Sequence, residues 1–238
     1  MRLLLTRPEP DAKRTAAALR IRGHTVLLAP LMRIEPLANA SIGDGPWAAI
    51  LVTSANAAHW LEISESRPAL LALPVFAVGA RSAHAMRATG FTDVTAADGG
   101  VDDLVRLVAA RMLPGAALLY LAGEDRSGDL AGDLRGRGFA VRTVAVYRAV
   151  VLAKLPQAAA DALPAGLDGV LHFSRRSAEA YLSAARAAGM LEAALQPAQY
   201  CLSRQIAEPL RRAGAGIVRI APVPSEAALI DLIGAHPA

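Results

Sequence analysis

Strand-like and helix-like segments alternate along the whole chain, and this alternation limits the possible folds more than any other feature. Short apolar stretches, such as those that begin near Leu3, Ala48 and Asp168, have the nearly continuous hydrophobic character of strands buried on both faces. Stretches with helical spacing of apolar residues follow them, and several of these end at a glycine. The alternation predicts an α/β fold with parallel sheets and right-handed crossovers.

The order of these segments is repeated within the chain. The matching pairs are residues 51–58 with 171–178, 76–90 with 200–214, and 3–28 with 118–144. The chain therefore contains a βαβ unit, a three-strand unit, and a second copy of each. One βαβ unit and one three-strand unit together predict a flavodoxin-like, parallel five-stranded sheet. The units can pair as consecutive halves, or crosswise so that the first unit joins the last.

Two overlong extended segments favour the crossed pairing. Residues 25–37 and 140–151 each begin as a strand after a glycine turn, at Gly23 and Gly138, and continue well beyond the usual length of about 5–6 residues. Two such connectors lying side by side would form a hinge between two lobes, with Tyr147 at the mouth of a cleft. The predicted boundaries are 1–36 with 150–238 for lobe 1, 37–149 for lobe 2, and connectors near 30–38 and 145–152.

Composition excludes several classes of function. Among 238 residues, 54% are hydrophobic and the formal net charge is +4, yet the basic residues form no run and no aromatic side chains are interleaved with them. Nucleic-acid binding is therefore disfavoured, and a polyanionic small molecule suits the charge better. One cysteine, Cys201, cannot form a disulfide framework or a cysteine metal cluster. Without a signal-like start or an apolar run near 20 residues, we expect no membrane association and a cytoplasmic location.

Candidate ligand-binding residues lie where predicted strands end and helices begin. Ligands of open α/β sheets gather at the carboxyl ends of strands, and helix N-termini offer free N–H groups to anions. A serine at such a place is most often only a helix cap, but here the pattern occurs in both halves of the chain. The candidate substrate-binding residues are Thr6, Arg7, Thr53, Ser54, Ala55, Gly79, Ser82, Gly123, Ser174, Arg175, Ser203 and Gln205.

Tyr147 is the candidate catalytic residue. It lies at the junction of a strand and a connector, and a phenol with a pKa near 10 stays protonated at neutral pH and can donate its proton. Packing is the alternative role for a strand tyrosine. His172 lies within a predicted strand, which favours a structural role over that of a base. Dinucleotide, Walker and zinc-binding motifs are not found, so we expect no cofactor and no metal.

Five short motifs, in this order and spacing, resemble the uroporphyrinogen-III synthase family over essentially the whole chain. They are residues 5–8 (Leu-Thr-Arg-Pro), 52–57 (Val-Thr-Ser-Ala-Asn-Ala), 76–79 (Phe-Ala-Val-Gly) with Ser82, 146–148 (Val-Tyr-Arg) and 172–174 (His-Phe-Ser). Two positions depart from the family pattern. Ser203-Arg204-Gln205-Ile206 replaces Gly-x-Thr-Thr, and Ser174-Arg175-Arg176 replaces Ser-Pro-Ser, so that arginines stand where small residues are common.

The resemblance implies two flavodoxin-like lobes joined by a two-stranded β-ladder. It implies that the linear tetrapyrrole hydroxymethylbilane, which carries eight carboxylates, is cyclised to uroporphyrinogen III with inversion of ring D, without a cofactor. The family's tyrosine falls on Tyr147, which would help to expel the hydroxyl group, and its hydroxyl positions fall on Ser54 and Ser82. Handover of substrate from the preceding pathway enzyme is a further implication. The alternative is a cytoplasmic two-lobed sensor or carrier that binds a small anion without catalysis.

Overall fold

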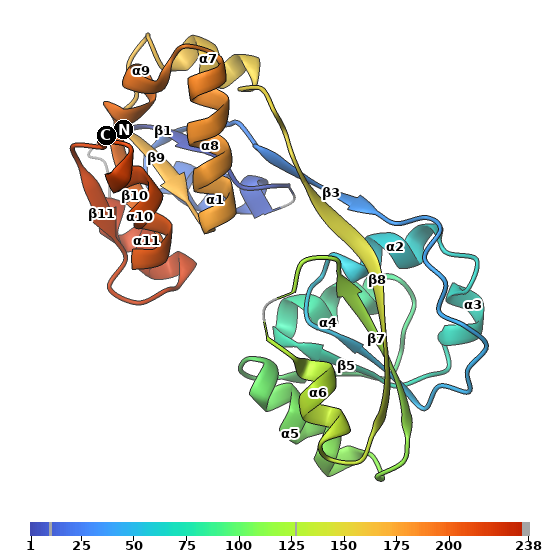
Figure 1. The fold of residues 1–238 in the computed structure, drawn as a ribbon. Helices are drawn as coiled ribbons and strands as arrows, with labels where there is room; N and C mark the ends of the chain where they lie inside the picture. Colours follow the sequence, from blue (N-terminus) through green and yellow to red (C-terminus); the bar gives the residue numbers. More distant parts are fainter. Residues whose placement is uncertain (10, 127, 235–238) are drawn as a thin grey trace. The chain divides into compact units, whose positions relative to one another are not determined.

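The computed structural model describes residues 1–9, 11–126 and 128–234. The chain divides into two compact units, one formed by residues 1–33 with 150–238 and the other by residues 34–149 (Figure 1). Each unit has its own hydrophobic clusters and its own sheet, wholly parallel in the first unit and parallel in the second except at β3, which runs antiparallel to β8. The α/β fold with mainly parallel sheets that the alternation of segments predicts is confirmed.

The sheet of the first unit joins the two ends of the chain. Its five strands lie in the order β11-β10-β9-β1-β2, and all neighbouring pairs are parallel. Leu3 at the centre lies opposite Val26 on one side and Gly169 on the other. The strands are β1 (Arg2–Leu5), β2 (Thr25–Leu28), β9 (Gly169–His172), β10 (Ala198–Cys201) and β11 (Val218–Ile220).

Helices cover both faces of this sheet. One face packs on α8 and α10 through a cluster that includes Tyr181 and Leu210, and the other packs on α1 and α11 through Leu19 and Leu229. The helices are α1 (Asp11–Ile21), α7 (Gln157–Ala162), α8 (Arg175–Ala187), α9 (Leu191–Leu195), α10 (Arg204–Arg212) and α11 (Glu226–Ile233). Because both faces are covered, the strands can be apolar throughout.

The second sheet has six strands in the order β3-β8-β7-β4-β5-β6. The prediction of five strands in this lobe is therefore wrong by one, because β3 adds to the outer edge of β8. Leu37 N donates to Val146 O at 2.8 Å, and the Arg148 guanidinium pairs with Glu35 at 3.0 Å. The strands are β3 (Met32–Pro36), β4 (Ala49–Val52), β5 (Val75–Val78), β6 (Val94–Ala97), β7 (Ala117–Gly123) and β8 (Ala140–Val151).

Two layers of helices enclose the second sheet. Trp60 and Met86 belong to the cluster under α2, α3 and α4, whereas Leu104 and Leu134 belong to the cluster under α5 and α6. The helices are α2 (Ala57–Ile63), α3 (Arg67–Leu70), α4 (Gly79–Ala88), α5 (Val101–Arg111) and α6 (Leu130–Arg135). Across the described ranges, every helix is too short or too polar to cross a membrane.

Candidate functional site

A β-bulge near the end of β8 determines where Tyr147 lies. The pairing of β8 with β7 is regular up to Ala145, which lies opposite Ala122, and then Tyr147 lies opposite Gly123. Val146 is therefore the extra residue, and its side chain is fully buried. A bulge bends the strand and redirects the side chains that follow it. It thus places Tyr147 at the carboxyl edge of the sheet, where parallel α/β sheets bind ligands.

Gly123 provides the space that the Tyr147 ring occupies. A Cβ atom at this position would lie 2.8 Å from Cε2, 2.9 Å from Cζ and 3.0 Å from the hydroxyl oxygen of Tyr147. These distances are shorter than real Cβ contacts, so any larger residue would displace the ring. The backbone also fixes this junction, because Glu124 N donates to Tyr147 O at 2.8 Å.

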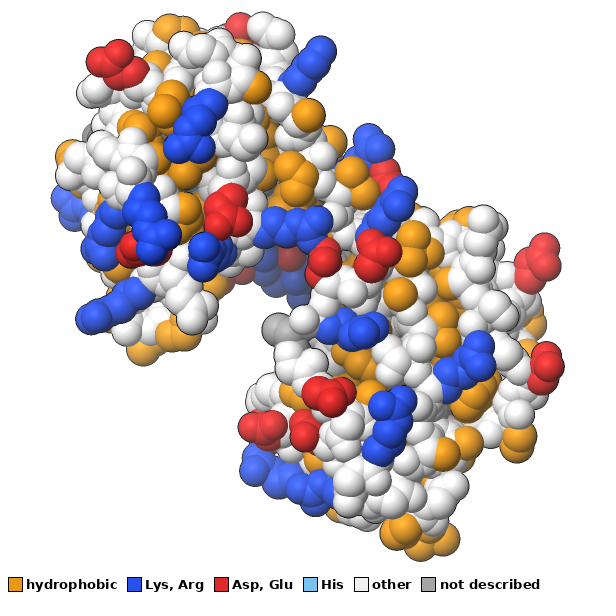
Figure 2. Space-filling model, in the orientation of Figure 1, with side chains coloured by type: hydrophobic (Ala, Val, Ile, Leu, Met, Phe, Trp, Pro, Cys, Tyr) orange, Lys and Arg blue, Asp and Glu red, His pale blue; other side chains and the backbone are white. Residues whose placement is uncertain are grey.

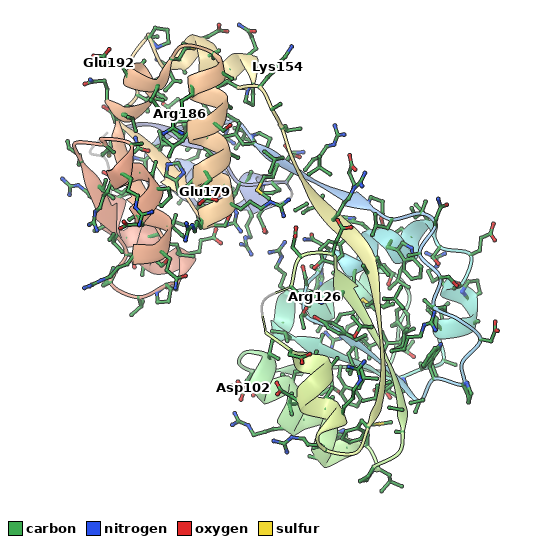
Figure 3. All side chains as sticks on the ribbon, viewed as in Figure 1. Asp102, Arg126, Lys154, Glu179, Arg186 and Glu192 are labelled. Atoms are coloured by element: carbon green, nitrogen blue, oxygen red, sulfur yellow. The ribbon has the colours of Figure 1, made fainter. Side chains whose placement is uncertain are left out.

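Tyr147 lines a cavity of about 280 Å³ at the carboxyl ends of β4, β5, β7 and β8. Polar groups of several kinds surround this space, including hydroxyls, one carboxylate and one guanidinium. Figure 3 labels Arg126, which belongs to the loop between β7 and α6. The lining residues are Thr53, Ser54, Val78, Gly100, Val101, Tyr120, Gly123, Asp125, Arg126, Leu130 and Tyr147.

Two tyrosine phenols pair with two neighbouring hydroxyls in this cavity. Tyr147 forms a side-chain hydrogen bond with Ser54, and the Tyr120 hydroxyl lies 3.0 Å from Thr53 Oγ1. Burial raises the pKa of Tyr147 above its ordinary value, the hydrogen bond with Ser54 partly opposes this, and the nearby Tyr120 raises the pKa further. The Tyr147 phenol therefore carries its proton at neutral pH and can serve as a donor.

The other candidates of this unit lie outside the cavity lining. Ala55 is half-buried in the turn before α2, where Asn56 N donates to Ser54 Oγ at 3.2 Å. Gly79 begins α4 with a φ of 72°, a conformation that suits glycine. Ser82 is buried one turn further along α4, at 5% exposure. Of the predicted residues, the cavity thus brings together Thr53, Ser54, Gly123 and Tyr147.

In the first unit, Thr6 and Arg7 make internal contacts. Thr6 is fully buried and donates its hydroxyl to Leu171 O at 3.0 Å. The Arg7 guanidinium pairs with Asp11 at 2.9 Å and with Glu226 at 3.1 Å, and it lies 4.2 Å from the centre of the Phe173 ring. The charge of Arg7 is thus balanced by carboxylates of its own unit.

Ser174 and Arg175 are engaged at the start of α8. Ser174 Oγ accepts a hydrogen bond from Ser177 N at 3.1 Å, which is the cap expected of a serine at this place. Arg175 pairs with Glu179 at 2.8 Å, and both side chains are exposed. Figure 3 labels Glu179 on α8. Ser174 and Arg175 therefore stabilise α8 itself: the serine caps its N-terminus, and the arginine forms an exposed ion pair along the helix.

Ser203 and Gln205 lie at the start of α10. Ser203 borders a hollow of about 630 Å³, together with Arg204 and Arg211, at the carboxyl ends of β10 and β11. Its side chain makes no capping hydrogen bond, and Gln205 is exposed. Because Arg204 and Arg211 both line this hollow, it offers a pair of guanidinium groups to an anion.

The face drawn in Figure 2 shows no such separation of charge among the described residues, since basic side chains are interspersed with acidic ones over both units.

Sequence reasoning did not select Tyr120, Asp125, Arg126 or Arg211 as site residues. Asp125 and Arg126 lie in the loop after a predicted strand, so the tendency of ligands to bind at the carboxyl ends of parallel strands could have identified them. Tyr120 lies inside a strand, and only the tertiary packing brings it to the cavity beside Thr53. Arg211 comes from the last turn of α10 and reaches its hollow along the helix.

His172 is a structural residue, as its position in a strand indicates. It is fully buried, its Nε2 lies 2.9 Å from Gln199 Oε1, and burial lowers its pKa to about 4. The ring is therefore neutral at physiological pH and does not take part in the polar cavity of the other unit. Among the described residues, no group of three or more His, Cys, Asp or Glu side chains could hold a metal ion.

Two solved structures share the fold of this chain over nearly its full length. The uroporphyrinogen-III synthetase of Helicobacter pylori matches with a TM-score of 0.64 and 17% identity, and the alignment covers 98% of each chain. A mutant uroporphyrinogen III synthase from Thermus thermophilus matches with a TM-score of 0.50 and 18% identity, over 98% of this chain and 96% of the other. At such identities these matches show the fold alone.

The sequence itself matches a protein family. No curated protein matches the chain. A family model described as uroporphyrinogen-III synthase HemD matches residues 13–231, which include the bulge, both tyrosines of the cavity and all but two of the candidate residues. With a match of this length, the chain belongs to the uroporphyrinogen-III synthase family.

Proposed function

We propose that the cavity beside Tyr147 is where this protein assists the loss of water from its substrate. The protein is a cyclising lyase of tetrapyrrole biosynthesis, which converts the small molecule hydroxymethylbilane to uroporphyrinogen III with inversion of ring D. The observation that carries the proposal is the placement of a protonated phenol beside Gly123 at the carboxyl edge of a parallel sheet. The surrounding hydroxyls, Thr53 and Ser54, suit a leaving hydroxyl group.

Tyr147 would act as the general acid. Its proton passes to the hydroxyl oxygen of the substrate while the carbon–oxygen bond breaks, and the electron pair of the adjacent pyrrole stabilises the resulting electrophilic carbon. The phenolate then takes the pyrrole N–H proton, which restores the phenol, so that the net products of this step are water and the neutral azafulvene. Ring D attacks the electrophile through its substituted carbon, which gives the spiro intermediate and the inverted ring.

Both units would supply groups that bind the carboxylates of the substrate. In the second unit these are Thr53, Ser54, Ala55, Gly79, Ser82 and Gly123, and in the first unit Thr6, Arg7, Ser174, Arg175, Ser203 and Gln205. Free N–H groups at helix starts suit carboxylates, and the hollow beside Ser203 adds two arginines. Thr6 and Arg7 would act through the backbone around them, because their side chains are already engaged.

The finer architecture forms part of the same proposal. The spatial order β2-β1-β9-β10-β11 is that of a flavodoxin-like sheet, and β8-β7-β4-β5-β6 repeats it. We propose two flavodoxin-like lobes, with residues 1–36 and 150–238 in one and 37–149 in the other. Strands β3 and β8, tied by the Arg148–Glu35 ion pair, would form the two-stranded ladder. A cytoplasmic location and handover from the preceding pathway enzyme complete the proposal.

The experiment is to supply freshly made hydroxymethylbilane to the purified protein and separate the isomers by chromatography. The parent protein should form the type III isomer faster than the type I isomer forms by spontaneous closure without inversion. Tyr147→Phe should lower the rate of type III formation by at least about tenfold, because general acid catalysis contributes roughly 10²–10⁴-fold. Circular dichroism should show an unchanged fold.

Tyr200→Phe is the matched control, because it removes a phenol oxygen from β10 in the other unit. It should keep the parent rate. Equal rates of type III formation by the parent and Tyr147→Phe would disprove the acid role. Formation of only the type I isomer by the parent protein would contradict the proposed function itself.

A further inference from the structure

Tyr120 is a second phenol of the cavity, and its ring and its oxygen have different surroundings. The side chain is 5% exposed and its ring packs in the cluster with Phe76 and Leu104. Tyr120 lines the cavity, and its hydroxyl lies 3.0 Å from Oγ1 of Thr53, a lining residue that follows the end of the neighbouring strand β4. A buried phenol oxygen requires a hydrogen-bond partner, and here that partner is itself a cavity hydroxyl.

We propose that Tyr120, acting through the Thr53 hydroxyl, positions the leaving hydroxyl group of the substrate beside Tyr147. This inference rests on the proposed function of the cavity. Tyr120 is a positioning residue in this scheme, since Thr53 makes the contact with the substrate oxygen. In this scheme, the leaving oxygen of the substrate receives its proton from Tyr147, which is paired with Ser54, and a hydrogen bond from Thr53, which is paired with Tyr120.

Hydrogen-bond arithmetic assigns the direction of the Tyr120–Thr53 bond. Each hydroxyl has one proton to donate and two lone pairs, and a phenol O–H is a stronger hydrogen-bond donor than the O–H of an aliphatic alcohol. Tyr120 is therefore the better donor, and Thr53 Oγ1 the better acceptor. The Thr53 proton is then free to point into the cavity.

The departing oxygen can use this second donor. As the carbon–oxygen bond breaks, negative charge develops on the oxygen, which takes one proton from Tyr147. Its remaining lone pairs can accept a hydrogen bond from Thr53, and a donor aimed at developing charge favours the transition state over the ground state. Without Tyr120, the Thr53 hydroxyl could turn toward another acceptor and this alignment would be lost.

The first test uses Tyr120→Phe in the full-length protein with hydroxymethylbilane as substrate. The variant keeps the buried ring and removes only the oxygen. We expect kcat for type III formation to fall about three- to tenfold, as for loss of one hydrogen bond, with KM unchanged. The alkaline limb of the kcat profile should also move to lower pH, because the nearby Tyr120 helps to raise the pKa of Tyr147.

The Thr53 variants separate positioning from a purely structural effect. Thr53→Val should reproduce the loss in kcat, and Thr53→Ser should restore most of it because the hydroxyl is retained. The double variant Tyr120→Phe with Thr53→Val should be no slower than the slower single variant, since the two groups act as one unit. Tyr200→Phe should leave kcat and the pH profile unchanged.

Several outcomes would overturn the inference. An unchanged kcat and pH profile in Tyr120→Phe would do so, as would a loss that Thr53→Ser does not restore and that parallels a fall in thermal stability. The proposed function is tested separately. If Tyr147→Phe is slow and Tyr120→Phe is not, only the role of Tyr120 is lost. If the parent forms only the type I isomer, the function of the cavity fails as well.

Discussion

The absence of a side chain at Gly123 determines where the Tyr147 phenol lies. The predicted change is Gly123→Ala, whose methyl group would lie within 3.0 Å of the phenol ring. Because the backbone at Gly123 is not in a left-handed conformation, alanine fits the strand and the ring must move instead. Turnover should fall toward that of Tyr147→Phe, with a loss of about 1–3 kcal/mol in stability at most.

Steady-state kinetics and urea unfolding measure the two effects separately. Gly216→Ala is the control, because its new Cβ would meet nothing within 4 Å. Full activity of Gly123→Ala would mean that the phenol does not need its observed position.

Part of the cavity could be predicted from the sequence, because some of its residues are polar and occupy recognisable positions relative to the predicted strands. Thr53 and Ser54 follow the end of β4, where parallel sheets bind ligands, and Tyr147 was selected at the junction of a strand and a connector; the structure places all three around one cavity. The Tyr120 hydroxyl could not be predicted, because its position inside a strand is typical of packing. The engagement of Arg7 by Asp11 and Glu226 was equally hidden, since Glu226 comes from the other end of the chain.

At the scale of elements, β9 and β10 are joined by a buried pair, His172 and Gln199, at 2.9 Å. Gln199 Nε2 also donates to Ala194 O at 3.1 Å and to Pro197 O at 2.8 Å, which holds its side chain in place. The pKa of His172 is lowered from 6.5 to about 4, chiefly by burial, and the hydrogen bond with Gln199 partly opposes this. Between pH 6.5 and about 4, the unfolded chain therefore binds a proton at this imidazole that the folded protein does not.

This pair predicts how stability depends on pH. The contribution of His172 is fully present above pH 6.5 and is lost as the pH falls from 6.5 toward 4, by up to about 3 kcal/mol. His172→Gln, which cannot titrate, should flatten the unfolding free energy over this range in urea titrations. His84→Gln replaces an exposed histidine and should follow the parent. A parent-like slope in His172→Gln would contradict the prediction.

Element boundaries were predictable where one physical rule dominated. Buried parallel strands such as β4 and β9 have continuous apolar runs, and glycines end the helix segments before β2 and β8. The short helices α3 and α9 were not predicted, because four or five residues are too few to establish a helical period. The bulge at Val146 depends on the pairing of two strands, so the sequence of one strand could not reveal it.

At the scale of the whole molecule, the two sheets have the same spatial order of strands, although the first is built from two separate segments of the chain and the second unit from one continuous segment. Strand order in the first unit runs β2-β1-β9-β10-β11, and in the second β8-β7-β4-β5-β6 beside β3. The internal repeat predicts the composition of such sheets, because each contains one βαβ unit and one three-strand unit. The repeat does not predict that β3 adds a sixth strand, because this depends on how many residues of the first connector form hydrogen bonds with β8.

The second unit should fold alone. Residues 34–149 are continuous in the chain and contain the helices and hydrophobic clusters of both faces of their sheet. A fragment of these residues should show a cooperative urea transition and dispersed amide signals in NMR. A fragment of residues 1–149 should add only disordered signals for residues 1–33, since β1 then lacks β9. Absence of a cooperative transition in the shorter fragment would contradict this expectation.

The joining of both chain ends in one sheet has a consequence for synthesis. On the ribosome, β1 and β2 emerge before β9 and cannot acquire it as a neighbour until more than a hundred further residues have been translated. Meanwhile the intervening segment can complete its own sheet. Until then, the apolar side chains of Leu3, Leu4 and Leu5, which are fully buried in the folded protein, have only part of their packing partners and stay exposed to other chains.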